Sequence, residues 1–230
     1  MITGSKTIID KNGNVDQKPI NEIYLRQEEY EGTMYVFIQA PGVDFEFKDG
    51  RLRHNMNWDR NGWDDDKRIH FEFDIVVKMP KNLRVKASTI NGGTLSVVNM
   101  QNGVEAGNVN GNVYLKEVAG QTTARTVNGD VEVYFAKSPK EDSHFNTVNG
   151  SMEIYSPDDL GAIVTFESLH GDLYTDFEQV SRLKNQLNKE KTGDGFRYRV
   201  GKTTPIQIGK GGPKMEFETV NGSAYIRKRK

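Results

Sequence analysis

Residues 124–133, ARTVNGDVEV, decide the fold, because an Asn-Gly pair there separates two short runs of alternating apolar and polar residues. The pattern recurs at 87–97 (ASTINGGTLSV), 106–115 (AGNVNGNVYL), 145–154 (FNTVNGSMEI), 166–175 (FESLHGDLYT) and 217–226 (FETVNGSAYI). Most copies follow one another at intervals of about 20 residues, which is typical of stacked repeat proteins. The sequence therefore predicts a repeat architecture.

Each copy is expected to form a strand, a sharp corner and a second strand. Residues two and four positions after the glycine are apolar in most copies, with Gly93 taking one extra position in the first copy and Thr175 standing in the fifth, which is the period of a half-buried strand. Asn and Gly both tolerate a left-handed backbone, so we interpret the corner pairs as structural rather than ligand-binding. An amide ladder along the stack is a further structural role for the Asn column. The corner residues are Asn91, Gly92, Asn110, Gly111, Asn128, Gly129, Asn149, Gly150, His170, Gly171, Asn221 and Gly222.

Parallel stacking of the copies is the favoured arrangement. The apolar columns superpose from copy to copy without reversing direction, as expected when identical positions stack about 4.8 Å apart. The alternative is an antiparallel meander or sandwich, because an Asn-Gly pair between strands also suits a hairpin. The expected fold is all-β, a parallel β-solenoid with Val-Asn-Gly corners.

The remaining segments are expected to belong to the same domain, residues 1–230. Residues 1–80 are interpreted as degenerate N-terminal coils that cap the solenoid, and 81–177 as regular coils. Residues 178–212 are an insertion, with a short helix expected at 180–189 and a strand at 196–200. Residues 213–230 form the final coil. The basic residues Arg227 to Lys230 are expected to be a solvated terminus.

The segment DIVVKMPKNLRVKASTINGGTLSV (74–97), the repeated TVNGD and TVNGS corners and the closing IGKGGPKMEFETVNGSAYIRK resemble the bacterial putative-adhesin domain family, a family of unknown function. The resemblance covers roughly residues 71–228. It implies a single-stranded, right-handed β-helix-like stack and export to the bacterial envelope. The family defines no catalytic motif, and the chain departs from the pattern at His170 and in its long insertion.

Composition and motifs exclude several classes of site. The chain has no cysteine, so disulfides and thiolate metal sites are ruled out, and its net charge of -1 does not favour nucleic-acid binding. The four histidines lack a metalloprotease spacing, and neither a nucleophile elbow nor a Walker loop occurs. The acidic loops at 10–16 and 59–66 are interpreted as turns rather than calcium sites. We expect no cofactor and no metal.

The candidate contact residues are tyrosines that follow the corners. They fall three or five positions after a glycine, out of phase with the apolar columns, so all should share one outer face. Such rings can contact a ligand, stack on one another, or be covered by the insertion. The five residues are Tyr114, Tyr134, Tyr155, Tyr174 and Tyr225.

These observations favour a non-enzymatic, adhesin-like binding scaffold of the cell envelope. Its expected partner is a cell-surface polysaccharide or an envelope protein. The alternatives are a structural or assembly protein that docks to a partner, and a polysaccharide-active enzyme that uses paired carboxylates. No signal peptide or transmembrane segment is evident, so the expectation of export rests on the resemblance.

Overall fold

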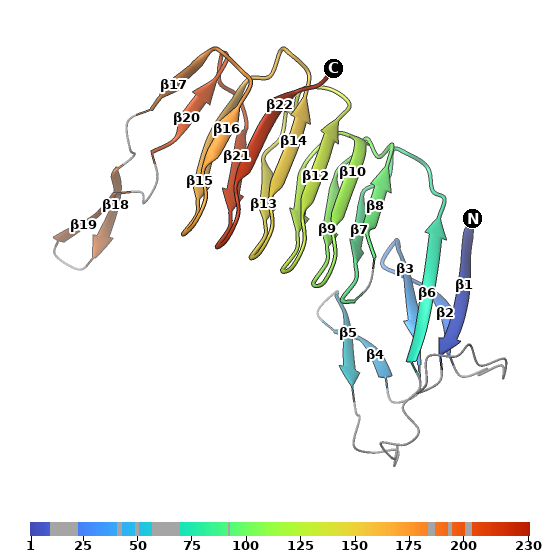
Figure 1. The fold of residues 1–230 in the computed structure, drawn as a ribbon. Helices are drawn as coiled ribbons and strands as arrows, with labels where there is room; N and C mark the ends of the chain where they lie inside the picture. The colour runs from blue at the N-terminus through green and yellow to red at the C-terminus, as the bar shows by residue number, and fades with distance from the viewer. Residues whose placement is uncertain are drawn as a thin grey trace. The chain divides into compact units, whose positions relative to one another are not determined.

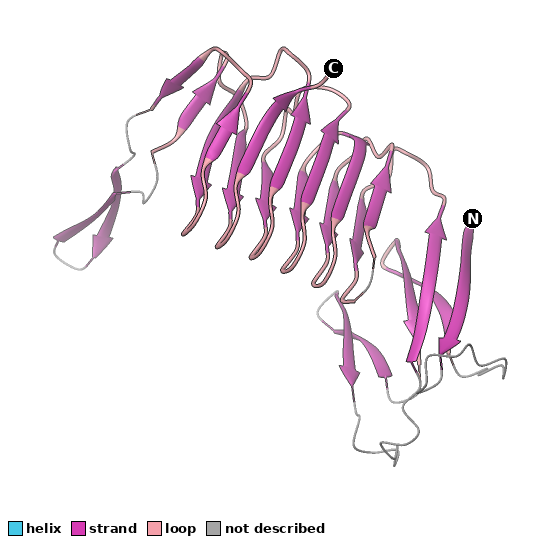
Figure 2. Cartoon of the chain, in the orientation of Figure 1, coloured by secondary structure: helices cyan, strands magenta, loops and turns pink. Residues whose placement is uncertain are grey.

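The computed structural model describes residues 1–9, 23–40, 43–48, 51–56, 70–91, 93–183, 187–192, 195–200 and 204–230. All regular elements in this part of the chain are strands, which confirms the all-β prediction (Figure 2). The chain divides into two compact units, residues 1–79 and 80–230. This differs from the expected single solenoid domain.

The first unit is built from antiparallel pairs rather than from the degenerate parallel coils expected for residues 1–80. The pairs are β1 (Ile2–Ile9) with β6 (His70–Val77), β2 (Tyr24–Tyr30) with β3 (Thr33–Gln39), and β4 (Val43–Lys48) with β5 (Arg51–Met56). Glu31 and Gly32 join β2 to β3 with φ angles of 49° and 73°. Positive φ at both central residues gives a turn whose twist suits antiparallel strands, which is why this segment forms a hairpin.

The second unit contains two sheets built by the repeat, and consecutive strands alternate between them (Figure 1). The first sheet has the spatial order β16 (Leu173–Thr175), β22 (Ala224–Lys228), β14 (Met152–Ser156), β12 (Val131–Phe135), β10 (Val113–Val118) and β8 (Leu95–Val98). The second has the order β17 (Val180–Arg182), β20 (Ile206–Ile208), β15 (Ala162–Glu167), β21 (Lys214–Glu218), β13 (Ser143–Asn146), β11 (Thr122–Arg125), β9 (Val104–Gly107) and β7 (Val85–Ser88). All repeat strands pair in parallel, as predicted.

The final repeat lies inside the stack rather than at its end. Strand β22 pairs with both β14 and β16, and β21 pairs with both β13 and β15. The apolar columns favour this position, because Phe217 is the Cα partner of both Phe145 and Phe166. Like side chains therefore stack on like even though the chain order is broken.

The insertion is made of strands. Strand β20 pairs antiparallel with β15 and with β17, and β18 (Leu187–Thr192) forms a hairpin with β19 (Gly195–Val200). The expected strand at 196–200 is confirmed. The expected helix at 180–189 is wrong, because pairing with β20 and β19 outweighs a weak local helix preference.

The core lies between the two sheets and is formed by the predicted columns. In the repeat strands of the first sheet, the residues two and four positions after the corner glycine point inward. In the repeat strands of the second sheet, the residue five positions before the corner glycine points inward. The fully buried members include Val113, Leu115, Val131, Val133, Met152, Ile154, Ala224, Ile226, Ala124, Phe145 and Phe217. Each large aliphatic member contributes about 1.5–3 kcal/mol by leaving water.

Corner glycines allow adjacent backbones to approach closely. Gly129, Gly150 and Gly222 have φ angles of 154°, 153° and 150°. A Cβ added at Gly150 would lie 1.9 Å from the carbonyl oxygen of Gly129, closer than atoms can approach. The Asn residues do not adopt the left-handed geometry expected of them, because the positive φ falls on the glycines. Gly92 lies outside the described residues.

The amides of the Asn column form the ladder predicted from the sequence. Each Nδ2 donates to the Oδ1 of the preceding coil at 2.8–2.9 Å, along the series Asn221, Asn149, Asn128, Asn110 and Asn91. His170 takes the next position in the stack, paired with Asn221 through the backbone. The ladder joins the amides of neighbouring repeats to one another, in line with the structural role expected of this column.

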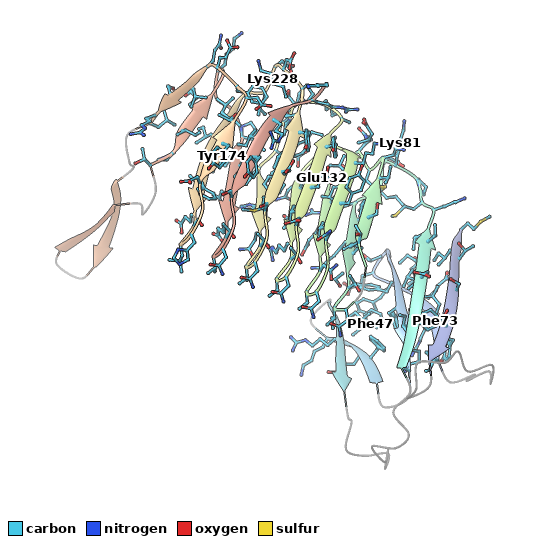
Figure 3. All side chains as sticks on the ribbon, in the orientation of Figure 1. Phe47, Phe73, Lys81, Glu132, Tyr174 and Lys228 are labelled. Atoms are coloured by element: carbon cyan, nitrogen blue, oxygen red, sulfur yellow. The ribbon has the colours of Figure 1, made fainter. Side chains whose placement is uncertain are left out.

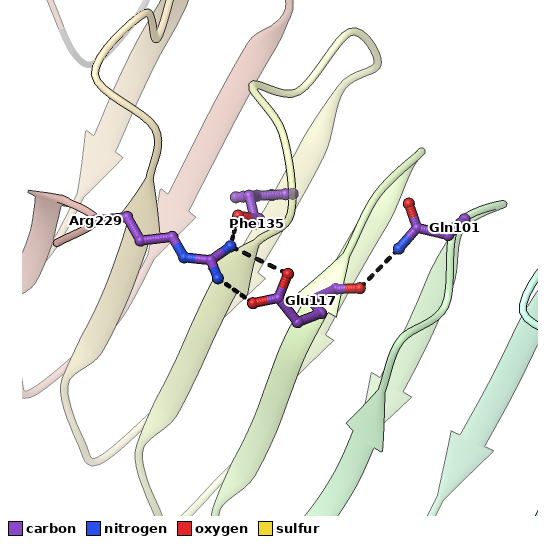
Figure 4. A network of polar contacts seen from close by, with 4 residues as sticks. All are labelled: Gln101, Glu117, Phe135 and Arg229. Carbon is purple, nitrogen blue, oxygen red and sulfur yellow. Dashed lines mark hydrogen bonds and ion pairs between the residues drawn. The ribbon is translucent and has the colours of Figure 1, made fainter.

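The basic terminus is not simply solvated, because Arg229 joins several coils (Figure 4). Its guanidinium donates to both carboxylate oxygens of Glu117 and, at 3.0 Å, to the carbonyl oxygen of Phe135. Glu117 has a φ of 55° at an irregularity in β10, and its carbonyl accepts a hydrogen bond from Gln101 Nε2 at 2.9 Å. The end of the chain thus contributes to the stability of the stack.

Replacement of a corner glycine should strongly destabilise the second unit. Gly150→Ala is expected to lower the free energy of unfolding by at least ~2 kcal/mol, because its Cβ would meet the Gly129 carbonyl and its backbone would be strained. Urea denaturation measures the effect.

Gly107→Ala is the matched control, since a Cβ there meets nothing within 4 Å. It should lower the free energy of unfolding by no more than about 0.5 kcal/mol, or raise it. Equal effects of the two substitutions would contradict the proposed role of the corner.

Candidate functional site

Five tyrosines lie on the outward face of the first sheet. Tyr114, Tyr134, Tyr155, Tyr225 and Tyr174 stand on β10, β12, β14, β22 and β16 respectively. Their neighbours in sequence point inward and are buried, as at Val113, Val133 and Ile154. Figure 3 shows Tyr174 and Glu132 on strands of this sheet. The structure thus brings all five predicted residues to one face.

Strand register arranges this face in two rows. In the first row, each residue is the Cα partner of the next, in the order Tyr114, Glu132, Glu153, Tyr225 and Tyr174. In the second row Lys116 is followed by Tyr134, Tyr155 and Arg227. The first row thus holds three tyrosines and two carboxylates, and the second row holds two tyrosines between a lysine and an arginine.

The rings form two groups of contacts. The Tyr134 and Tyr155 rings stack with centroids 4.3 Å apart and planes 3° apart, and Tyr114 meets Tyr134 edge-on at 5.9 Å. Tyr174 stacks on Tyr225 at 5.0 Å and 11°. These geometries are the favourable offset and edge arrangements of aromatic pairs.

Arg227 connects the two groups, although in the sequence it was expected only to be part of a solvated terminus. Its guanidinium carbon lies 4.8 Å from the centroid of the Tyr225 ring, and its Nε lies 3.5 Å from Glu153 Oε2. The signal was present, because Arg227 stands five residues after Gly222, in the column of Tyr134 and Tyr155. We name the five tyrosines with Arg227 the tyrosine strip.

Carboxylates on the same strands anchor the tyrosine hydroxyls. Tyr134 Oη donates to Glu132 and Tyr155 Oη to Glu153, both at 2.6 Å. These hydrogen bonds, with smaller contributions from desolvation and from the negative charge, raise the pKa of both phenols. The charge of Asp172, followed by desolvation, raises the pKa of Tyr174. The higher pKa keeps these three phenols neutral at physiological pH.

Stacking leaves different parts of each ring accessible. In the middle of the strip the faces of Tyr134 and Tyr155 cover one another, so ring edges are presented. Tyr114 and Tyr174 stand at the two ends, and Tyr174 is 49% exposed. No described residue of 178–212 makes a ring contact, hydrogen bond or ion pair with the five tyrosines.

Outside the tyrosine strip, the described residues include one close histidine–carboxylate pair. On the outward face of the second sheet, His144 Nδ1 lies 2.8 Å from Glu216 Oε2. No group of three or more possible metal ligands occurs among the residues that the structure describes. The acidic loops at 10–16 and 59–66 lie outside those residues. The described part of the chain also has no helix long and apolar enough to cross a membrane.

Comparison with known proteins assigns the chain to a family. The family model Toastrack DUF4097 matches residues 81–203. This chain belongs to the Toastrack DUF4097 family. The match confirms the resemblance seen in the corner repeats, and the final repeat at 217–226 lies beyond the matched Toastrack residues.

One solved structure is similar to this Toastrack chain at 12% sequence identity. It is described as a putative cell adhesion protein from Clostridium sporogenes ATCC 15579. The similarity covers 81% of this chain and 76% of that one, with a TM-score of 0.39. A search of curated proteins found no match.

The anchored hydroxyls predict a distinctive alkaline titration of the Toastrack chain. Glu132→Gln should lower the pKa of Tyr134 toward the ordinary value of about 10, because the carboxylate that holds the proton is gone. The effect on Tyr155 should be much smaller, since Glu153 is its main partner. NMR titration with Cζ-labelled tyrosine measures both values.

Glu105→Gln, on the second sheet, serves as the control and should leave both values unchanged. A wild-type Tyr134 that titrates near 10 would show that the Glu132 contact does not form in solution.

Proposed function

We propose that this chain is a non-enzymatic binding scaffold of the cell envelope whose tyrosine strip contacts a polysaccharide. In this proposal the second unit is a single right-handed parallel β-solenoid, which holds the strip rigid. The observation that carries the proposal is the strip itself, five rings and a guanidinium in sequence across five strands.

The chemistry of the strip suits a carbohydrate ligand. Sugar rings have apolar C–H faces that pack on aromatic rings, together with hydroxyls that hydrogen-bond to carboxylates and guanidinium groups. The exposed Tyr174 and the half-buried Tyr114 offer ring surface at the ends, while Glu132, Glu153 and Arg227 offer polar groups between them. The rings are held in place by their stacking and by their anchored hydroxyls, so little conformational entropy is lost on binding.

The contacts of the two carboxylates of the strip favour a binding role over a catalytic one. Glu132 and Glu153 each accept a tyrosine hydroxyl, and Glu153 also contacts Arg227. These contacts give the two carboxylates a positioning role. Export to the envelope is proposed from the resemblance to a family whose members are often exported.

Binding of glycans to the purified chain tests the proposal. On an array of bacterial and host polysaccharides, with and without calcium, we expect saturable binding to a defined polysaccharide and no release of reducing ends. Tyr114→Ser and Tyr174→Ser should each weaken that binding by about tenfold, since each removes an accessible ring.

Tyr24→Ser is the matched control, because Tyr24 is also 49% exposed but lies in the first unit. It should bind as the wild type does. Binding that the strip variants leave unchanged would place the site elsewhere, and release of reducing ends would favour the enzyme alternative. The absence of binding to any polysaccharide would favour the structural or assembly role, in which the chain docks to an envelope protein.

A further inference from the structure

The two sheets of the second unit end differently on the side of β16. The second sheet continues past β15 with β20 and β17, whereas the first sheet ends at β16, which pairs only with β22 among the described strands. The second sheet therefore extends two strands further than the first. One edge of the first sheet is left beside this extension without a partner strand.

The unpaired edge of β16 presents backbone groups. The carbonyl of Asp172 accepts from Ala224 N at 3.0 Å, and Asp176 N donates to the Ile226 carbonyl at 3.1 Å, so these groups point toward β22. Peptide groups of successive strand residues point to opposite sides. The N–H and C=O groups of Leu173 and Thr175 are thus directed to the free side, where an added strand could pair with them.

Tyr174 presents an open ring face on this same side. Its ring stacks on Tyr225 of β22, so its other face is turned away from β22. No other ring, cation or hydrogen-bond donor among the described residues contacts it, and its hydroxyl donates to Asp172 Oδ2 at 3.4 Å. The series of stacked groups therefore ends in an uncovered aromatic face.

The charged residues along β16 and its flanks are all acidic, although Lys228 Nζ of β22 lies 5.8 Å from the Phe177 ring centroid. Residues 166–178, FESLHGDLYTDFE, contain Glu167, Asp172, Asp176 and Glu178 and neither Lys nor Arg. All four carboxylate residues are exposed. Asp172 and Asp176 flank Tyr174 two residues away on either side, so a cation on the ring would lie beside two carboxylates. This is the charge complementarity expected for a basic partner.

The strip already contains one example of such a contact. Arg227 lies over the Tyr225 ring at 4.8 Å while its Nε lies 3.5 Å from Glu153, which is the Cα partner of Tyr225 on β14. Arg227 thus covers the face of Tyr225 that is turned toward β14. Tyr174 with Asp172 and Asp176 offers a ring and carboxylates without the guanidinium.

We propose that the free edge of β16 binds an extended basic segment of a partner protein as an added strand. An arginine of that segment stacks on the open face of Tyr174 and is flanked by Asp172 and Asp176. This interaction shares Tyr174 with the proposed glycan site, but it depends on the backbone edge of β16 and does not require glycan binding.

A second copy of the chain fits this edge less well. Its first coil carries Lys81, Arg84 and Lys86 without an acidic residue, so its charge is complementary. However, stacking a whole coil on β16 would also place β7 of that copy where β20 already pairs with β15. A single strand needs only the unpaired edge of the first sheet.

Peptide binding to the full chain tests the proposal. The probe is a seven-residue peptide of alternating arginine and valine with blocked termini and a fluorescein label. Its binding is measured by fluorescence anisotropy. We expect saturable binding that weakens as salt is raised. Tyr174→Ser should weaken binding by about tenfold, whereas Tyr174→Phe, which keeps the ring, should bind as the wild type does. Asp176→Asn should weaken binding and reduce its dependence on salt.

Peptide variants separate strand addition from simple charge attraction without altering the protein. Methylation of alternate amide nitrogens on one edge of the peptide should abolish binding, and lysine in place of arginine should weaken it. Tyr114→Ser, which lies at the other end of the strip and weakens the proposed glycan binding, should leave peptide binding unchanged.

Four results would overturn the proposal. They are no binding of the arginine peptide, equal binding of the methylated peptide, equal binding by Tyr174→Ser, and self-association of the free chain that Lys86→Glu abolishes. The last result would assign the edge to a second copy. If any of these four results is found while Tyr114→Ser still weakens polysaccharide binding, the proposed function stands and only this inference fails.

Discussion

Contact between corner backbones is the constraint on which the second unit depends. At Gly129, Gly150 and Gly222 a carbonyl of the adjacent coil occupies the space that a side chain would need. Because the corners meet so closely, successive coils cannot shift relative to one another, and the amide ladder of the neighbouring Asn residues holds the same spacing. The register of the repeat strands follows from this, since each lies at a fixed distance from its corner glycine.

A fixed register has two consequences, one on each side of the strands. Inward, it places Phe145 beside Phe217 and Val133 beside Ile154, so the core consists of columns of like residues. Outward, it places Tyr134 on Tyr155 and Tyr225 on Tyr174, and the rings stack because strand spacing brings them into range. In the middle of the sheet, the tyrosine rings pack against one another. At β16 the next strand is missing, and the same arrangement leaves a ring face and a backbone edge uncovered.

Residue columns made the parallel pairing, the core and the shared face of the five tyrosines predictable from the sequence. The position of the final repeat was not predictable, because a repeat fits equally well between any two coils with matching columns, and only tertiary pairing places Phe217 between Phe145 and Phe166. The hairpins of residues 1–79 depend on local turns such as Glu31-Gly32, which carries no repeat signal. The roles of Arg227 and Arg229 require partners distant in sequence, Glu153 and Glu117, so their charges alone indicated only a solvated end.

Continuity of the tyrosine strip requires that the final repeat lie between β14 and β16, and disulfide formation tests this directly in a chain that has no cysteine of its own. Glu153→Cys is combined either with Tyr225→Cys or with Tyr174→Cys, and the oxidised protein is analysed by thiol titration and peptide mass spectrometry. Residues 153 and 225 are Cα partners, whereas 153 and 174 are separated by β22 and stand about 10 Å apart, beyond the reach of a disulfide. We expect the first pair to form a disulfide and the second to remain reduced. A disulfide between positions 153 and 174, with none between 153 and 225, would mean that the repeats stack in chain order and would contradict the account.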